Sequence, residues 1–206
     1  MPQPMGILLL LVLSLAAAGL AVLTVVSLRQ RRRMRLARVA SDLGFRYSRE
    51  DLFNVPVRYA EFALVTSGHC LLASNVISGH LEGLAVRAFD FQYEVGHGTR
   101  RMTRQYGVVV VEMPSPLPRL LMWHNGDFTP IPARQATQTR GPWSFLGNAE
   151  LADGFIAAGD EWFAHGGCVE IRRHAILLAT PAPTGRDALV TSLPNIVHTV
   201  KRLLVT

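Results

Sequence analysis

The sequence is poor in cysteine and in charged residues. Its two cysteines among 206 residues, Cys70 and Cys168, are too few for a disulfide framework. Charged residues make up 17% of the chain, and no acidic residue precedes Asp42. We expect both thiols to be reduced, with a single bridge between them as the alternative.

Recognisable catalytic loops are also absent from the sequence. The chain contains no Gly-x-Ser-x-Gly elbow and no Walker-type phosphate loop. Gly96-His97-Gly98 resembles the start of a dinucleotide-binding loop, but it lacks the third glycine and a following helix pattern. We interpret it as a hairpin turn. The sequence therefore predicts no cofactor and favours a protein without enzymatic activity.

The basic character of the chain is concentrated in one short segment. The pI is about 10.1 and the formal net charge is +6. We call six of the basic residues the arginine collar: Arg29, Arg31, Arg32, Arg33, Arg35 and Arg38. Of the 21 Lys and Arg residues, the other 15 equal the 15 Asp and Glu residues, so the remainder is formally neutral. Nucleic acid is not an expected partner, because phosphate contacts need a net basic face.

The collar follows a long apolar run from Met5 to Leu28 that contains no charged residue. About 20 apolar residues are enough to span a bilayer core. Positive charge lies directly after the run, which predicts an N-terminus outside the cell and a cytoplasmic domain. The alternative is a signal peptide cleaved near Ala16-Ala17-Ala18, although residues 1–6 contain no Lys or Arg. We therefore predict a single-pass anchor over residues 1–28 of a cell-membrane protein.

The juxtamembrane segment, residues 29–44, has the pattern of a helix. Apolar residues recur at spacings of three and four, and Gly44 is a suitable helix end. Anionic lipid headgroups are the expected partner of the collar, at about 1 kcal/mol per arginine near the membrane surface. The alternative is a solvated basic flank that only sets the topology.

Residues 45–206 predict one α+β domain. Strands are expected over residues 70–81, 84–95, 102–112, 119–124, 168–171 and 175–179, the first three as an antiparallel meander. In the second strand, Phe89, Phe91 and Tyr93 share one face and should point into the core. Asp90 lies on the opposite face, where we expect it to be exposed or paired, with Arg101 and Arg104 of the next strand as candidate partners.

The rest of the domain predicts a long connection and a closing helix. Residues 126–147 are rich in Pro, Thr and Gln and are interpreted as the connection. From Thr184 onward an amphipathic stripe predicts a helix that covers the sheet, with Pro194 either at a kink or in the first turn. The predicted fold class is α+β: an N-terminal transmembrane helix, then an antiparallel sheet packed by a C-terminal amphipathic helix. Six strands and a helix also fit a pleckstrin-homology-like module by analogy.

Two His/Cys pairs suggest a metal site. His69-Cys70 and His165-Gly166-Gly167-Cys168 supply the ligand set of a Cys2His2 zinc site. Adjacent residues on a regular strand point to opposite faces, so His69 and Cys70 can share an ion only from a turn. A small hydrolase or metal-dependent enzyme built on these residues is the alternative to a binding module.

Several segments together resemble an uncharacterised bacterial family of single-pass membrane proteins. The similar stretches are Ser74-Asn75-Val76-Ile77-Ser78-Gly79, Val86-Arg87-Ala88-Phe89-Asp90-Phe91-Gln92-Tyr93, Gly96-His97-Gly98, Val108-Val109-Val110-Val111-Glu112 and, as a second landmark, residues 155–164. The resemblance implies an N-terminal membrane helix and a domain with a Phe-Asp-aromatic strand. Family members usually carry a further helix after the second landmark, for which residues 165–168 leave no room. The resemblance implies architecture and no catalytic residues.

The sequence thus predicts a non-enzymatic binding or scaffolding module at the cytoplasmic membrane face. Its expected partners are membrane lipid at the collar and a protein. A second copy of the chain is a further candidate partner, with residues 126–147 and the C-terminal helix as the contact surface.

Overall fold

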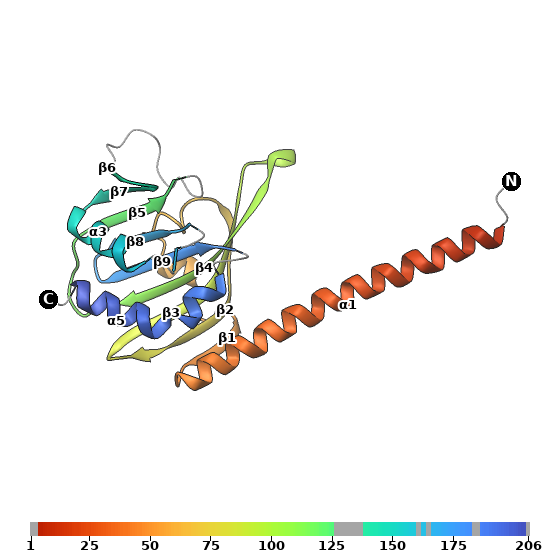
Figure 1. The fold of residues 1–206 in the computed structure, drawn as a ribbon, viewed down its shortest axis with the longest axis horizontal. Coiled ribbons are helices and arrows are strands. Elements are labelled where there is room, and N and C mark those ends of the chain that lie inside the picture. The colour runs from red at the N-terminus through yellow and green to blue at the C-terminus, as the bar shows by residue number, and fades with distance from the viewer. Residues whose placement is uncertain (1–3, 126–137, 160–161, 164–165, 183–185, 205–206) are drawn as a thin grey trace.

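The computed structural model describes residues 4–125, 138–159, 162–163, 166–182 and 186–204. A long helix, α1, runs from Pro4 to Asp42 and leads into a domain built on one sheet (Figure 1). The strands in the described residues are β1 (Arg46–Glu50), β2 (His69–Leu81), β3 (Leu84–Val95), β4 (Met102–Glu112), β5 (Leu120–His124), β6 (Gln138–Arg140), β7 (Trp143–Gly147), β8 (Cys168–Arg172) and β9 (Ala175–Pro181). The helices of the domain are α2 (Val55–Arg58), η1 (Gly98–Arg100), α3 (Ala149–Ala158), α4 (Arg186–Thr191) and α5 (Leu193–Leu204).

The strands form a nine-stranded antiparallel sheet in the order β1-β2-β3-β4-β9-β8-β5-β7-β6. The predicted meander of β2, β3 and β4 is confirmed, as is the β8–β9 hairpin. This hairpin pairs with β4 on one side and β5 on the other, so it joins the two halves of the sheet. The fold class is α+β, as the sequence predicts.

Three strands lie outside the ranges that the sequence predicts, which is why the sheet has nine strands instead of six. Two of them correct the interpretation of residues 126–147 as one connection, because this range contains β6 and β7. Trp143 and Phe145 are buried on β7, and Gly141 has the left-handed backbone (φ +55°) of the turn between the two strands. Residues 126–137 lie outside the described residues. The third strand, β1, pairs with β2 at the sheet edge.

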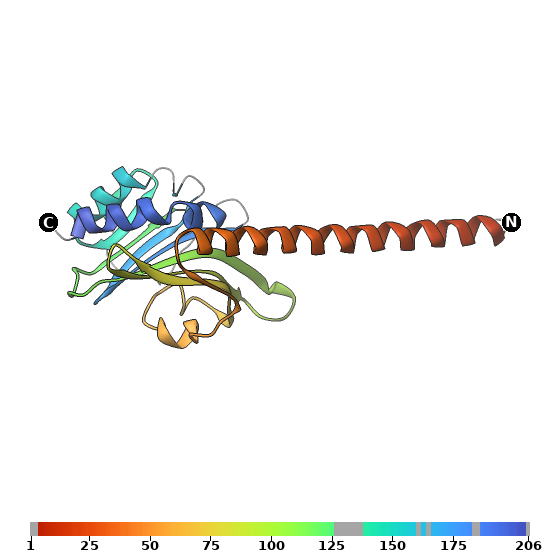
Figure 2. The ribbon, with the colours of Figure 1, turned by 90° about the horizontal axis from the view of Figure 1, so that it is seen from below.

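The sheet has a hydrophobic core on each face. One core joins the sheet to α3, α4, α5 and the end of α1. The other contains the predicted row of Phe89, Phe91 and Tyr93 and packs against α2 and the segment around it. Figure 2 shows the helices above the sheet and the α2 segment below it. The prediction that the aromatic row points into a core is confirmed.

The C-terminal stretch forms two helices instead of one. α4 ends at Thr191, and α5 begins at Leu193. Pro194 therefore lies in the first turn of a helix, as one of the two alternatives predicts, and does not kink a longer one. Leu193, Ile196 and Val200 of α5 are buried in the core of the helical face. The predicted cover of the sheet by an amphipathic helix is confirmed. Thr184, the expected helix cap, lies outside the described residues.

Helix α1 has two parts with different surroundings. Its apolar part extends away from the domain in both views (Figures 1 and 2) and is exposed, and it is long and apolar enough to cross a membrane. Its last turns lie against β1 and β2, where Leu36 and Ala40 are buried in the core. One continuous helix therefore joins the apolar segment to the domain.

Candidate functional site

The six arginines of the collar divide between two faces of α1. Successive residues of an α-helix turn by about 100°, so Arg29, Arg32 and Arg33 share the face of the buried Leu36 and Ala40. The other three point away from the domain and are exposed: Arg31, Arg35 and Arg38. The collar thus has an inner face on the sheet and an outer face in solvent.

Arg32 on the inner face forms an ion pair with two acidic residues of the domain. Its Nη1 and Nη2 atoms bind the two carboxylate oxygens of Asp90 in β3 at 2.6 and 2.9 Å. Its Nε atom donates to Oδ1 of Asp187 in α4 at 2.8 Å. Burial alone would lower the pKa of the Arg32 guanidinium, but the hydrogen bonds to both carboxylates outweigh it and raise that pKa. Arg32 therefore stays charged and joins α1, the sheet and α4.

This finding corrects the expected partner of Asp90. The sequence suggested Arg101 or Arg104 of the next strand, and Arg101 pairs with Glu94 instead. Asp90 lies on the helical face of the sheet, as its alternation with Phe89 and Phe91 predicts. The last turns of α1 lie across that same face, so a cation of the collar reaches the carboxylate.

A bulge in β2 supports the Arg32–Asp90 pair. The register between β2 and β3 shifts between Ser74 and Ile77, and Asn75 within this interval has a left-handed backbone (φ 52°). The Asn75 side chain donates to Oδ2 of Asp90 at 2.7 Å and accepts from the Tyr47 hydroxyl at 2.8 Å. The bulge therefore turns a strand residue toward Asp90 and fixes the carboxylate for Arg32.

Beside this ion pair lies a pocket of about 400 Å³ between α1 and the sheet. Its walls are the inner-face arginines on one side and mainly polar residues of β2, β3 and β4 on the other: Ser74, Asn75, Asp90, Gln92 and Gln105. Among the described residues, Arg29 and Arg33 have no acidic partner, whereas Arg32 is paired. The pocket thus offers two cations and several hydrogen-bonding groups, a combination that suits an anion such as a phosphate.

The β3–β4 hairpin lies on the same side of the domain as this pocket. In both views it extends beyond the sheet on the side from which α1 leaves (Figures 1 and 2). Gln92 and Gln105 pair where the hairpin passes the pocket, and the tip lies three to four residues farther along. Exposed arginines and an exposed methionine lie near the tip: Arg100, Arg101, Met102 and Arg104.

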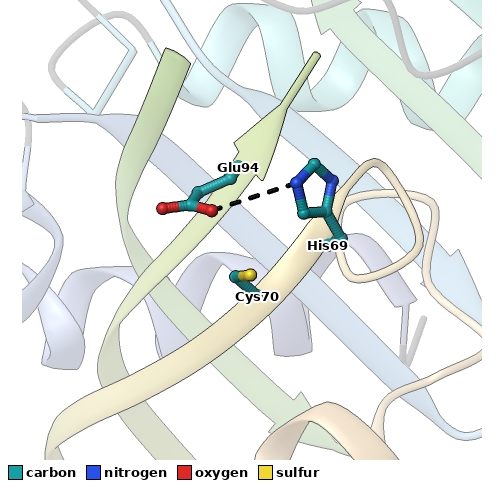
Figure 3. Close-up of side chains that lie close together, drawn as sticks. All are labelled: His69, Cys70 and Glu94. Atoms are coloured by element: carbon teal, nitrogen blue, oxygen red, sulfur yellow. Dashed lines mark ion pairs between the residues drawn. The ribbon is translucent and has the colours of Figure 1, made fainter. Parts of the chain in front are cut away.

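The predicted metal ligands are brought together only in part. His69 and Cys70 lie beside Glu94 of β3, and the three side chains point toward a common space (Figure 3). Among the residues that the structure describes, Cys168 belongs to no such group, and it is buried in β8, opposite Trp123 and Ala179. His165 lies outside the described residues, so the Cys2His2 set stays a prediction. Both cysteines are free, which excludes the alternative of a bridge between them.

A further charged cluster lies on the opposite face of the sheet. Glu112 of β4 accepts from Arg58 and Tyr59 of the α2 segment, at 3.0 Å each, and pairs with Arg87 of β3. Burial would raise the pKa of Glu112, but the hydrogen bond from Arg58 and the charge of Arg87 outweigh it and lower that pKa. These contacts hold the α2 segment on the sheet.

Comparisons with known proteins identify one relevant fold. The chain is similar to the crystal structure of the mycobacterial trehalose monomycolate transport factor A, with a TM-score of 0.58. The match covers 84% of this chain and 95% of that one at 15% identity, a level that shows a shared fold. No family model and no curated protein sequence matches the chain.

Sequence reasoning missed the inner face of the collar, although a signal for it was available. A helical projection places Arg29, Arg32 and Arg33 with Leu36 and Ala40, which indicates that part of the collar faces the domain. Nothing in the sequence pointed to Asp187 as a partner, because 155 residues separate it from Arg32.

Proposed function

We propose that this protein is a membrane-anchored, non-enzymatic module that binds an anionic lipid headgroup in the pocket between the collar and the sheet. The anchor is α1, and the domain lies on the cytoplasmic side, as the position of the collar after the apolar run favours. The outer face of the collar points away from the domain into solvent. The inner face holds the headgroup.

The position of the pocket along the chain supports this proposal most directly. Arg29 is the first residue after the apolar run and lines the pocket, so the pocket begins at the level where lipid headgroups lie. Asp90 and Asp187 already neutralise Arg32, which leaves Arg29 and Arg33 for a ligand. A headgroup phosphate with one negative charge, together with Asp90 and Asp187, balances the three inner-face arginines. The occupied pocket then carries no net charge.

The shared fold supports a place for this module in membrane transport. The structural neighbour is named as a transport factor for trehalose monomycolate. Combined with the anchor-like helix, this likeness favours a non-enzymatic component of a transport apparatus over a free-standing enzyme. In that setting the domain scaffolds a protein partner at the membrane, while the headgroup in the pocket fixes its orientation.

Lipid retention by the full chain tests the proposal. The protein is purified in detergent with mixed phosphatidylglycerol and phosphatidylcholine, and bound lipid is counted by native mass spectrometry. We expect the wild type to retain phosphatidylglycerol selectively, and R29Q/R33Q to lose about tenfold or more of that retention, as removal of two charge-assisted contacts implies.

The chain offers a matched control with the same loss of charge. R31Q/R35Q removes two arginines from the outer face, which does not line the pocket. We expect this variant to retain phosphatidylglycerol like the wild type. Equal loss in both double variants would show nonspecific attraction to the collar and would overturn the pocket as the binding site.

A further inference from the structure

We propose that His69, Cys70 and Glu94 bind a divalent transition-metal ion of the zinc type. The three residues each offer one ligand atom, and these atoms all lie within 4.8 Å of one another (Figure 3). The site lies where β2 begins beside the end of β3, close to the tip of the β3–β4 hairpin. It is separate from the proposed headgroup pocket, whose lining includes none of the three residues.

A second bulge in β2 makes this arrangement possible. On a regular strand His69 and Cys70 would point to opposite faces. Here the register with β3 shifts between His69 and Leu72, and Cys70 has a left-handed backbone (φ 52°) that a residue with a Cβ rarely adopts. Both side chains consequently turn toward Glu94. The bulge thus satisfies the geometric condition that the sequence had set for chelation by neighbouring residues.

The backbone is also shaped for close approach at this point. A Cβ on Gly68 would overlap the carbonyl oxygen of Glu94 and the ring of Tyr93, so only glycine allows β2 to start so close to β3. Next to the site, the ring of His97 stacks on His69 with a centroid separation of 5.1 Å. Gly68 and His97 therefore position the ligands from outside the cluster.

The cluster supplies one carboxylate, one thiol and one imidazole as ligands for a cation. The Glu94 carboxylate forms an ion pair with Arg101. The Cys70 thiol carries a proton that a metal ion displaces, because the thiolate is the ligand form of cysteine. A divalent ion replaces that proton: the S–H bond breaks, a metal–thiolate bond forms, and one proton leaves to solvent. Arg101 and His69 both approach the same carboxylate oxygen of Glu94, Oε2, so the ion replaces Arg101 at this oxygen or binds Oε1.

The ligand set identifies the class of metal. Thiolate and imidazole are ligands that zinc and its neighbours prefer, whereas magnesium and calcium select sets made of oxygen alone. Three protein ligands of the types Cys, His and Glu leave a fourth tetrahedral position for water or another ligand. His69 and Cys70 are accessible from solvent, with the His69 side chain 41% exposed, so an ion can reach the site.

Metal titration of the full chain in detergent tests the site. After treatment with a chelator, we expect the wild type to bind one equivalent of Zn²⁺, and Co²⁺ to give the absorption of a cobalt–thiolate bond. C70S should lose the cobalt–thiolate band, and E94Q should weaken Zn²⁺ binding by about tenfold or more. E94Q keeps the shape of the side chain, so it remains informative if C70S folds poorly.

The second cysteine supplies the matched control. C168S alters the buried thiol outside the cluster and should keep both the band and the stoichiometry. Absence of stoichiometric metal in the wild type, an unchanged band in C70S, or equal loss in C168S would each overturn the proposal. Retention of phosphatidylglycerol by C70S is measured in parallel and is expected to be unchanged, which separates this site from the headgroup pocket.

Discussion

Arg32 in α1 and Asp90 in β3 form a two-point ion pair across 58 residues of sequence, at 2.6 and 2.9 Å. The pair joins the helix that carries the apolar segment to β3 of the sheet. Both side chains are mostly buried, with 16% and 14% exposed. Their attraction is therefore screened less by solvent than that of surface pairs. The domain is consequently held against the end of α1 and does not hang from a loose linker.

Loss of Arg32 should destabilise the protein measurably. R32A leaves the carboxylate of Asp90 partly buried without its cation, and we expect the free energy of unfolding to fall by about 1–3 kcal/mol. R31A on the outer face is the control, with an expected change within about 0.5 kcal/mol. Chemical unfolding of the full chain in detergent measures both. Equal values for the two variants would contradict the structural role of the pair.

The tip of the β3–β4 hairpin should touch the membrane surface. From Gln92, beside the pocket, the strand continues to Gly96 with a rise of about 3.3 Å per residue, which carries the tip about 13 Å farther. An environment-sensitive fluorophore on M102C, in a C70S background, should shift its emission to the blue when the protein enters lipid nanodiscs. The same dye on H80C, which lies toward the other end of the sheet, should show no such shift. Matching responses at the two positions would refute this orientation.

Acid should weaken the contact of the α2 segment with the sheet. Because the pKa of Glu112 is lowered in the fold, its contribution is present above the usual pKa and is lost as the pH falls through the folded pKa. E112Q should lose about 1–2 kcal/mol of stability at pH 7, since Arg87 is then partly buried without its counter-charge. Unfolding curves between pH 3 and 7 should be flatter for E112Q than for the wild type. A parallel pair of curves would argue against this role of Glu112.

Glu170 in β8 should have the opposite pH dependence. Burial raises its pKa above the ordinary value, against the hydrogen bond from Arg172, so the fold favours the protonated form. Its contribution is therefore complete below the ordinary pKa and declines as the pH rises through the folded pKa. E170Q keeps an oxygen that can accept from the Ala63 amide and removes this dependence. Between pH 4 and 8 the free energy of unfolding should fall less for E170Q than for the wild type. A larger fall in E170Q would contradict the assignment.

Local patterns in the sequence determine much of this fold. The apolar run, the alternation of β3 and the stripe of α5 depend on the two periods that place residues on one face of a helix or strand. These periods predict which side chains are buried without knowledge of the partner. For this reason six strands, the aromatic row and the covering C-terminal helix could be predicted. β1 and β6 were missed because their side chains are mostly exposed and show no apolar alternation, and β7 was missed because it lies in a range rich in Pro, Thr and Gln.

Local sequence patterns therefore account for the apolar helix, the basic collar and the antiparallel sheet covered by a helix. The use of the collar depends on the folded arrangement, because the packing of α1 against β1, β2 and α4 brings Arg32 to Asp90 and Asp187. The two bulges of β2 also depend on the folded sheet. One turns Asn75 toward Asp90, and the other turns His69 and Cys70 toward Glu94. A bulge depends on the register between strands, and register is set by packing on both faces of the sheet and not by the residues of one strand.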